Sequence, residues 1–265
     1  MKTIGFIGCG NMGGAIIGGI IKSGIAQQEN IVVYDKNEES IKNLKYKVSV
    51  AKNEKDAAER SDILFLAVKP AVIYDVINVV KDTVCDNTVI VSIAAGQSIE
   101  KIEKAFGKRI SLMRVMPNTP ALVGEGMSAL SPNAVLDNDE ESKEYIMKIF
   151  SGVGKAEIVP ERLMDAVTGV SGSSPAYVFM FIEALADAAV AAGMPRNQSY
   201  TFAAQAVLGS AKMVLETGLH PGVLKDMVCS PGGTTIDAVR VLEEKGMRSA
   251  VIEAVKACVE KAGKL

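Results

Sequence analysis

Tryptophan is absent from this chain of 265 residues, histidine occurs once, and only four cysteines are present. The cysteines (Cys9, Cys85, Cys229 and Cys258) are widely spaced and form no Cys-x-x-Cys pair. That spacing argues against a disulfide framework and against a zinc site, and it fits a reducing compartment. We therefore expect no metal, and little scope for a histidine acting as general acid or base.

The chain also has no large excess of positive or negative charge: its 29 basic and 31 acidic residues leave a net charge of −2. No basic stripe predicts nucleic-acid binding, and the N-terminus has neither the basic region nor the cleavage site of a signal peptide. The most apolar stretch, residues 176–192, contains Glu183 and Asp187, which are costly inside a bilayer. We expect a cytoplasmic protein in which this stretch is a buried helix, with no membrane segment.

The most informative segment lies at the N-terminus, where an apolar run ends in a Gly-x-Gly-x-x-Gly motif and a helix-forming segment follows at once. Gly8 permits the tight turn from strand to helix, Gly10 lets the backbone approach a pyrophosphate, and Gly13 lets the helix pack closely on the strand. A second apolar run ends in Asp35, about 20 residues beyond the motif, where an acid that binds a ribose is expected. The pattern predicts dinucleotide binding. The alternative is a glycine-rich turn that binds nothing.

Apolar runs alternate with helical segments over the first 160 residues. The expected strands are Thr3–Ile7, Ile31–Tyr34, Val48–Ala51, Ile63–Val68, Thr88–Ile93, Arg109–Met116, Gly126–Leu130 and Ala156–Val159. The expected helices are Gly14–Lys22, Glu38–Lys45, Glu54–Arg60, Val72–Val80, Ile99–Phe106 and Asn138–Phe150. Continuous apolar strands separated by helices predict an α/β fold with a parallel sheet covered on both faces. Residues 1–160 are thus expected to form a Rossmann-like dinucleotide-binding domain.

Strand signals stop after residue 160, and residues 161–265 are expected to form an all-helical domain. The expected helices are Glu161–Gly169, Pro175–Ala192, Gln198–Glu216, Ile236–Glu244 and Arg248–Ala262. The second and third of these are apolar nearly all round, and such helices must be covered on most sides. A domain of this size has little interior in which to hide them, so we expect a dimer with interleaved helices. The alternative is an ordinary compact helical domain.

Two groups of residues are candidates for a binding site. The first follows three strands of the expected sheet, at Ala67–Pro70, at Ala94–Gly96 and around Asn118. Ligands of open α/β sheets bind beyond the carboxyl ends of the strands, which favours a cofactor trough over simple turn chemistry. The second group is Ser230–Thr235, a loop with two glycines and two threonines before a helix. Its backbone N–H groups and hydroxyls predict a receptor for a small carboxylate, although a helix cap with a flexible turn is the alternative.

The rest of the chain offers no obvious general acid or base. His220, the sole histidine, stands in an expected loop, where such a residue is more often a solvated surface group. Hydride transfer to a protonated imine needs no such residue, because the nitrogen already carries its proton. A dinucleotide fold with a carboxylate receptor therefore favours imine reduction.

These motifs together resemble the pyrroline-5-carboxylate reductase family nearly end to end. The segments that carry the resemblance are residues 6–13, 65–70, 114–120, 165–177 and 220–235, of which the last is the most specific. The resemblance implies reduction of 1-pyrroline-5-carboxylate to L-proline by NADPH or NADH, the final step of proline biosynthesis. It also implies a homodimer, with dimers assembling further into rings.

The resemblance also implies roles for individual residues. The expected cofactor-binding residues are Ile7, Gly8, Cys9, Gly10, Asn11, Met12, Gly13, Asp35, Lys36, Asn53, Ala67, Val68, Lys69, Pro70, Ala94, Ala95, Gly96 and Asn118. The expected substrate-binding residues are Glu161, Ser230, Gly232, Gly233, Thr234 and Thr235, and Thr235, near the ring nitrogen, is the expected catalytic residue.

Three questions stay open. Asp35 favours NADH because it would repel a 2′-phosphate, but the adjacent Lys36 offsets that repulsion. A β-hydroxyacid dehydrogenase has a similar layout, but its catalytic lysine is missing from the helix beginning at Pro175. A dinucleotide-sensing module without turnover is the third possibility, and it would not need the donor-rich loop.

Overall fold

The computed structural model describes residues 2–264. The chain forms two compact units: the first runs to Ser173 and takes in the chain from Cys258 on, and the second is Ser174–Ala257. The end of the last helix joins the first unit, where the Ser173 hydroxyl lies 3.1 Å from Cys258 Sγ. The predicted domains, 1–160 and 161–265, end at residues 1 and 265, which lie outside the described residues, and their boundary stays a prediction.

The first unit is built on one eight-stranded sheet with the order β3-β2-β1-β4-β5-β6-β7-β8. The strands are β1 (Ile4–Ile7), β2 (Ile31–Tyr34), β3 (Ser49–Val50), β4 (Ile63–Leu66), β5 (Val89–Ser92), β6 (Ser111–Met116), β7 (Gly126–Pro132) and β8 (Gly154–Ile158). Neighbours pair in parallel, except β6 and β7, which are antiparallel. The order reverses at β1, which lies between β2 and β4, as in a Rossmann fold.

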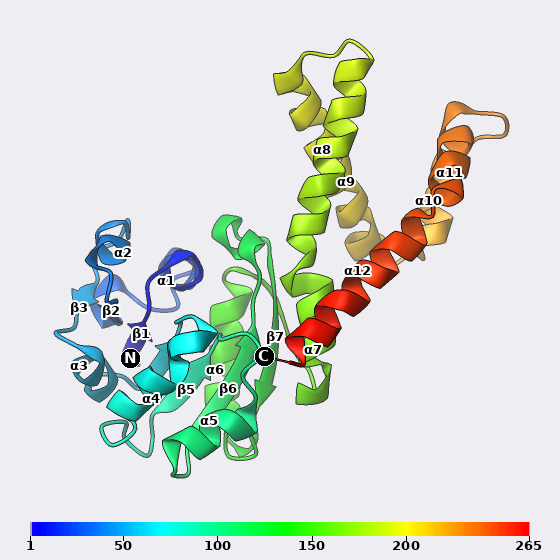
Figure 1. Ribbon diagram of the computed structural model, residues 1–265. Coiled ribbons are helices and arrows are strands. Elements are labelled where there is room, and N and C mark those ends of the chain that lie inside the picture. Colours follow the sequence, from blue (N-terminus) through cyan, green and yellow to red (C-terminus); the bar gives the residue numbers. More distant parts are fainter. Residues whose placement is uncertain (1, 265) are drawn as a thin grey trace. The chain divides into compact units, whose positions relative to one another are not determined.

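Helices cover both faces of this sheet, as the sequence predicts (Figure 1). One face carries Phe6 and Phe65, whose rings stack 4.4 Å apart, and packs against α1 (Asn11–Lys22) and α6 (Glu140–Ser151). The other face packs against α3 (Glu54–Glu59), α4 (Ile73–Val80) and α5 (Ile99–Phe106). A short helix, α2 (Glu38–Lys42), follows β2. Each fully buried Ile, Leu or Phe side chain contributes about 1.5–3 kcal/mol to stability.

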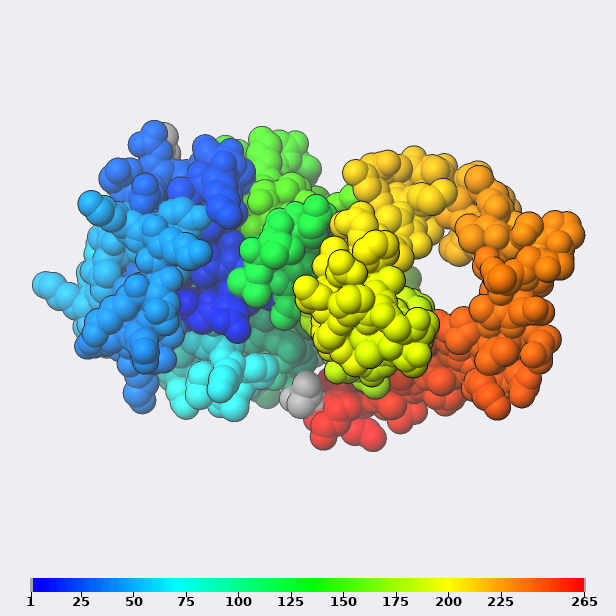
Figure 2. All heavy atoms as spheres, turned by 90° about the horizontal axis from the view of Figure 1, so that it is seen from above, coloured from blue at the N-terminus to red at the C-terminus, as the bar shows by residue number. Residues whose placement is uncertain are grey.

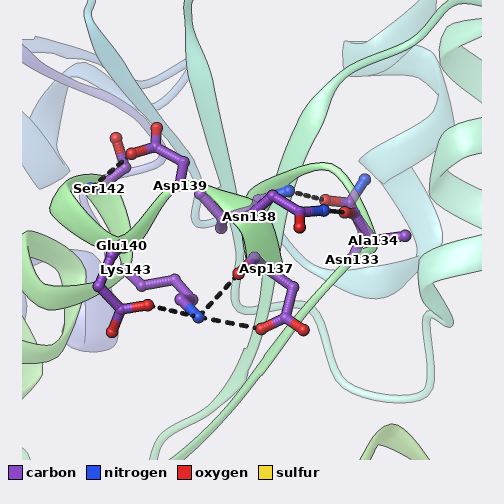
Figure 3. A network of polar contacts seen from close by, with 9 residues as sticks. Asn133, Ala134, Asp137, Asn138, Asp139, Glu140, Ser142 and Lys143 are labelled. Carbon is purple, nitrogen blue, oxygen red and sulfur yellow. Dashed lines mark hydrogen bonds and ion pairs between the residues drawn. The ribbon is translucent and has the colours of Figure 1, made fainter.

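A polar network fixes the link between β7 and α6 (Figure 3). Asn133 is 3 % exposed and fully hydrogen-bonded: its Oδ1 accepts from the N–H groups of Leu112 and Leu136, and its Nδ2 donates to the Ile110 carbonyl and to Glu103. In the same link, Asp139 caps α6 by accepting from the Ser142 N–H at 3.1 Å.

Lys143 closes the turn before α6. Its Nζ donates to the carbonyl of Asp137 at 2.8 Å and lies 2.9 Å from Glu140 Oε2 (Figure 3). The Asp137 and Glu140 carboxylates are 65 % and 74 % exposed, so water screens these contacts and they contribute little to stability.

The second unit is helical, as predicted, with α8 (Ser174–Ala191), α9 (Arg196–Thr217), α10 (Pro221–Val228), α11 (Thr234–Glu244) and most of α12 (Met247–Ala262). The prediction missed α10, for which His220 is the cap: its Nδ1 accepts from the Gly222 N–H at 3.0 Å, with Pro221 in the first turn. The predicted helix at Glu161–Gly169 is a 3₁₀ turn, the short helix α7 (Met164–Val167) and a π-helical turn over Thr168–Gly172.

Large apolar side chains of the second unit are exposed in the single chain. Phe179 is 62 % exposed, Met180 69 % and Phe202 65 %, and on α8 only Ala186 is buried among the described residues. In the space-filling view, its yellow and orange segments surround an opening rather than a filled core (Figure 2). The expectation that residues 176–192 form a buried helix is therefore wrong for the chain by itself. By length and composition alone, the helical run Glu161–Ala191 is apolar enough to cross a membrane.

Candidate active site

The carboxyl ends of β1, β2, β4, β5 and β6 lie along one edge of the sheet, because these strands run parallel. The loops after them carry most of the predicted cofactor-binding residues. The order of the strands reverses at β1, and open α/β sheets bind their ligands at such a switch point. The glycine motif follows β1 directly and therefore lies at this place.

The three motif glycines have different surroundings. A Cβ on Gly8, whose φ is +103°, would lie 2.3 Å from the carbonyl oxygen of Ala67, and one on Gly13 would lie 2.5 Å from that of Gly8. Both positions must therefore be glycine for the turn and helix to form. A Cβ on Gly10 would meet no protein atom within 4 Å. Gly10 opens instead onto a pocket, which is the surrounding that a closely approaching pyrophosphate requires.

That pocket has a volume of about 510 Å³. Predicted cofactor-binding residues that line it are Ile7, Gly8, Gly10, Asp35, Lys36, Ala67, Val68 and Lys69. The prediction missed other lining residues: Tyr34, Asn37, Ser40, Glu54, Val72, Asp75, Val76 and Val79. Glu54 could have been predicted from the sequence, since it follows shortly after a predicted strand and the carboxyl ends of parallel strands share an edge.

Asp35 is held in place by the backbone at the end of β2. Its Oδ2 accepts from the Cys9 N–H at 2.7 Å, and its Oδ1 accepts from the Asn37 N–H at 2.8 Å. Asp35 thus ties the glycine loop to β2 while its carboxylate lines the pocket.

The surroundings of the glycine loop raise the pKa values of two groups, the Cys9 thiol and the Tyr34 hydroxyl. Burial, with a smaller contribution from the charge of Asp35, raises the pKa of the Cys9 thiol to about 12. Burial first, and then the charges of Glu54 and Asp35, raise the pKa of the Tyr34 hydroxyl. Cys9 is therefore a neutral part of the loop, and Tyr34 lies within electrostatic range of both carboxylates.

Other predicted cofactor residues lie outside this pocket. Cys9 and Asn11 line a second pocket of about 520 Å³ along α1, which Gly10 also borders, and Met12 packs at the edge of the core. Asn53 caps α3, because its Oδ1 accepts from the Asp56 N–H at 2.9 Å. Both ends of the Asn118 amide are engaged: Nδ2 donates to the Ser171 carbonyl and Oδ1 accepts from the Met127 N–H.

The residues after β4 and β5 lie at the same edge of the sheet. Pro70 begins a 3₁₀ turn, Ala94 is buried, Ala95 is half-buried, and Gly96 has a φ of +73°. Small side chains at this edge leave the backbone accessible to a flat ligand.

The predicted substrate residues come from both units. Glu161 belongs to the first, where its Oε1 accepts from the Ile99 N–H at 2.6 Å and from Arg114 Nη1 at 2.9 Å. This carboxylate joins the start of α5 to β6. The Glu161 side chain is 33 % exposed.

The Ser230–Thr235 loop belongs to the second unit and forms a tight turn. The Gly233 N–H donates to the Ser230 carbonyl at 3.0 Å, and Gly232 has a φ of +67°. Gly233 precedes α11, and no side chain among the described residues caps that helix. The first N–H groups of a helix have no partner within it, so the start of α11, with Thr234 and Thr235, can bind a carboxylate.

Two family descriptions match the chain. "Pyrroline-5-carboxylate reductase dimerisation" matches residues 161–265, and "NADP oxidoreductase coenzyme F420-dependent" matches residues 3–96. The chain is 53 % identical to the pyrroline-5-carboxylate reductase of Escherichia coli, over 100 % of this chain and 98 % of that protein. It is 46 % identical to that of Methanosarcina acetivorans, again over 100 % and 98 %.

Solved structures agree with these relatives. A pyrroline-5-carboxylate reductase of Coxiella burnetii matches with a TM-score of 0.91 and 34 % identity, covering 99 % of this chain and 98 % of that one. The pyrroline carboxylate reductase of Plasmodium falciparum, solved with NADP bound, matches with a TM-score of 0.90 and 33 % identity, covering 99 % and 97 %. By identity along its full length and by fold, this chain belongs to the pyrroline-5-carboxylate reductase family.

Proposed function

We propose that this chain reduces the C=N bond of 1-pyrroline-5-carboxylate with NADPH or NADH and so forms L-proline, the final step of proline biosynthesis. The observation that carries the proposal is family membership along the whole chain, at 53 % identity to one relative, combined with a pocket that opens at Gly10.

The first unit holds the dinucleotide in this proposal. The backbone of the loop from Ile7 to Gly13 and the N-terminus of α1 face the pyrophosphate, with Gly10 supplying the close approach. Asp35 and Lys36 lie on the ribose side, with Asn53 near the adenosine. The residues after β4 and β5, together with Asn118, line the rest of the cofactor trough. When bound, the reduced dinucleotide supplies the hydride.

The second unit holds the acid. The turn from Ser230 to Gly233 and the uncapped start of α11 offer N–H groups to the substrate carboxylate, and Thr234 and Thr235 add hydroxyls. Thr235 is the proposed catalytic residue, with its hydroxyl at the ring nitrogen. Glu161 contributes its carboxylate to the substrate. No general acid is required, because the imine nitrogen already carries its proton.

Association through the second unit is part of the proposal. Its exposed apolar side chains, among them Phe179, Met180 and Phe202, require cover, and a second copy of this chain supplies it better than a lipid bilayer. Residues 161–265 match a family described by dimerisation, which supports the same arrangement. We further propose rings of such dimers and a cytoplasmic location.

The proposal is tested by following the absorbance of NADPH and of NADH after 1-pyrroline-5-carboxylate is added to the purified protein. We expect oxidation of the cofactor that depends on the imine. A parallel assay with 3-hydroxyisobutyrate and NAD⁺ tests the β-hydroxyacid dehydrogenase alternative. Cofactor binding without turnover of either substrate would favour the sensing module and overturn the proposal.

A further inference from the structure

We propose that this chain selects NADH over NADPH, because Asp35 and Glu54 make the ribose side of its pocket too negative for a 2′-phosphate. The inference rests on the proposed function, since it places the adenosine ribose beside Asp35. The proposed function allows either NADPH or NADH, and this inference states which of the two the chain prefers.

The first argument is the rigidity of Asp35. Both carboxylate oxygens accept hydrogen bonds from backbone N–H groups, at 2.7 Å from Cys9 and 2.8 Å from Asn37. The side chain cannot turn away from a phosphate without breaking these bonds and loosening the glycine loop. A carboxylate in this place accepts a hydrogen bond from a ribose 2′-hydroxyl, whereas a 2′-phosphate offers no such donor.

The second argument is the charge around the pocket. Three carboxylates line it, from Asp35, Glu54 and Asp75, against two ammonium groups, from Lys36 and Lys69. Tyr34 lines the same pocket, and the charges of Glu54 and Asp35 raise the pKa of its hydroxyl after the larger effect of burial. A dianionic phosphate would therefore enter a site that already carries excess negative charge.

Lys36 is the group that opposes this choice. It is exposed, and within residues 2–264 it takes part in none of the ion pairs found. A lysine ammonium is a flexible, strongly hydrated point charge, and solvent screens it. Asp35 is half-buried, and two backbone hydrogen bonds already hold its carboxylate in place. Its side chain therefore loses no further conformational entropy when the ribose binds beside it. We therefore expect the carboxylate to dominate.

The relative solved with NADP bound does not decide the choice, because it shares 33 % identity with this chain. A few residues around the ribose set the preference for NADH or NADPH. Two proteins that are 33 % identical can differ at these residues.

The test is calorimetric titration of the whole protein with NAD⁺ and with NADP⁺, which measures binding without turnover. We expect NADP⁺ to bind at least about tenfold more weakly than NAD⁺, and the ratio of the two Kd values to fall as salt is added. In Asp35→Ser and in Glu54→Gln the ratio should fall towards one. Glu39→Gln removes a charge from the exposed side of α2 and should leave the ratio unchanged.

The ratio separates specificity from damage to the site, because a loosened glycine loop weakens both ligands alike. If Asp35→Ser fails to fold, Glu54→Gln and the salt dependence of the wild type still decide the matter. Equal or tighter binding of NADP⁺ by the wild type would overturn the inference and leave the proposed function intact. Failure of the wild type to bind either dinucleotide would instead remove the proposed function.

Discussion

Gly8, Gly10 and Gly13 belong to one motif but differ in the space that each leaves for a side chain. Gly8 and Gly13 leave no room for a Cβ, because backbone carbonyl oxygens would lie 2.3 Å and 2.5 Å from it. Gly10 leaves room that the protein itself does not fill. The first two glycines are thus requirements of the fold, and we propose that the third is a requirement of the ligand.

This difference predicts opposite results for two substitutions. Gly8→Ala should lower the free energy of unfolding by about 2–4 kcal/mol, because it combines a clash with a positive φ. Gly10→Val should change it by no more than about 1 kcal/mol, yet weaken dinucleotide binding at least tenfold. Chemical denaturation and calorimetric titration measure the two quantities. Normal cofactor affinity in Gly10→Val would show that the pyrophosphate does not lie there.

Cys9 stands in the same loop as a buried neutral thiol. Because the thiolate is the reactive form, a pKa of about 12 should make Cys9 react at pH 8 on the order of 10³-fold more slowly than an ordinary thiol. Cys85 is exposed and serves as the internal control. Labelling with iodoacetamide followed by peptide mass mapping measures both, and unfolding should make the rates equal. Comparable labelling of the two in the native protein would contradict the burial of Cys9.

At the scale of elements, the cap of α6 links stability to pH. Hydrogen bonds from the Ser142 hydroxyl and then its backbone N–H lower the pKa of Asp139. A lowered folded pKa means that the stabilisation is fully present above the unfolded value of ~3.9 and is lost as pH falls through the folded value.

We therefore expect Asp139→Ala to cost about 1 kcal/mol of unfolding free energy at pH 7, and less as the pH drops below ~3.9. Asp139→Asn is the matched control, because asparagine caps a helix equally well without titrating. Urea denaturation across this range provides the measurement. A cost of Asp139→Ala that stays constant with pH would show that the carboxylate is not what caps α6.

The elements themselves could largely be predicted from sequence, and their long-range contacts could not. Apolar runs such as Ile63–Leu66 identify strands because these strands are buried on both faces. The helix α10 was missed because it is short, and His220-Pro221 read as a loop although a proline in the first turn permits a helix. The pairing of Arg114 with Glu161 depends on how distant segments meet, and no local pattern encodes it.

The same distinction applies to the candidate site. The glycine motif predicted Gly8 and Gly10 because a local turn positions them, and the spacing typical of a βαβ unit predicted Asp35 at the end of the second strand. Asp75 and Val76 reach the pocket from α4, whose placement depends on the strand order β1-β4. Lining residues of that kind follow from topology rather than from a motif.

At the scale of the whole molecule, the second unit lacks a filled interior in the single chain. Phe179 and Met180 are 62 % and 69 % exposed, which agrees with the prediction that apolar helices here need cover. We expect light scattering at micromolar concentration to give at least twice the chain mass of 28.0 kDa. Phe179→Asp should weaken this association, whereas Val50→Asp, at an exposed position on the edge strand β3, should not. A monomeric wild type would contradict the proposed dimer.

The central claim is that a dinucleotide held near Gly10 reduces a small cyclic imino acid held beside Thr235. The most direct measurement is the imine-dependent oxidation of NAD(P)H by the wild type, by Thr235→Ala and by Thr83→Ala, a matched control in the link between α4 and β5. One lost hydrogen bond to a charged group costs about 1.5–3 kcal/mol, so kcat/KM of Thr235→Ala should fall about 10- to 150-fold while its Kd for the dinucleotide stays unchanged. Thr83→Ala should match the wild type. Unchanged kinetics in Thr235→Ala, or a wild type that oxidises no cofactor, would contradict the account.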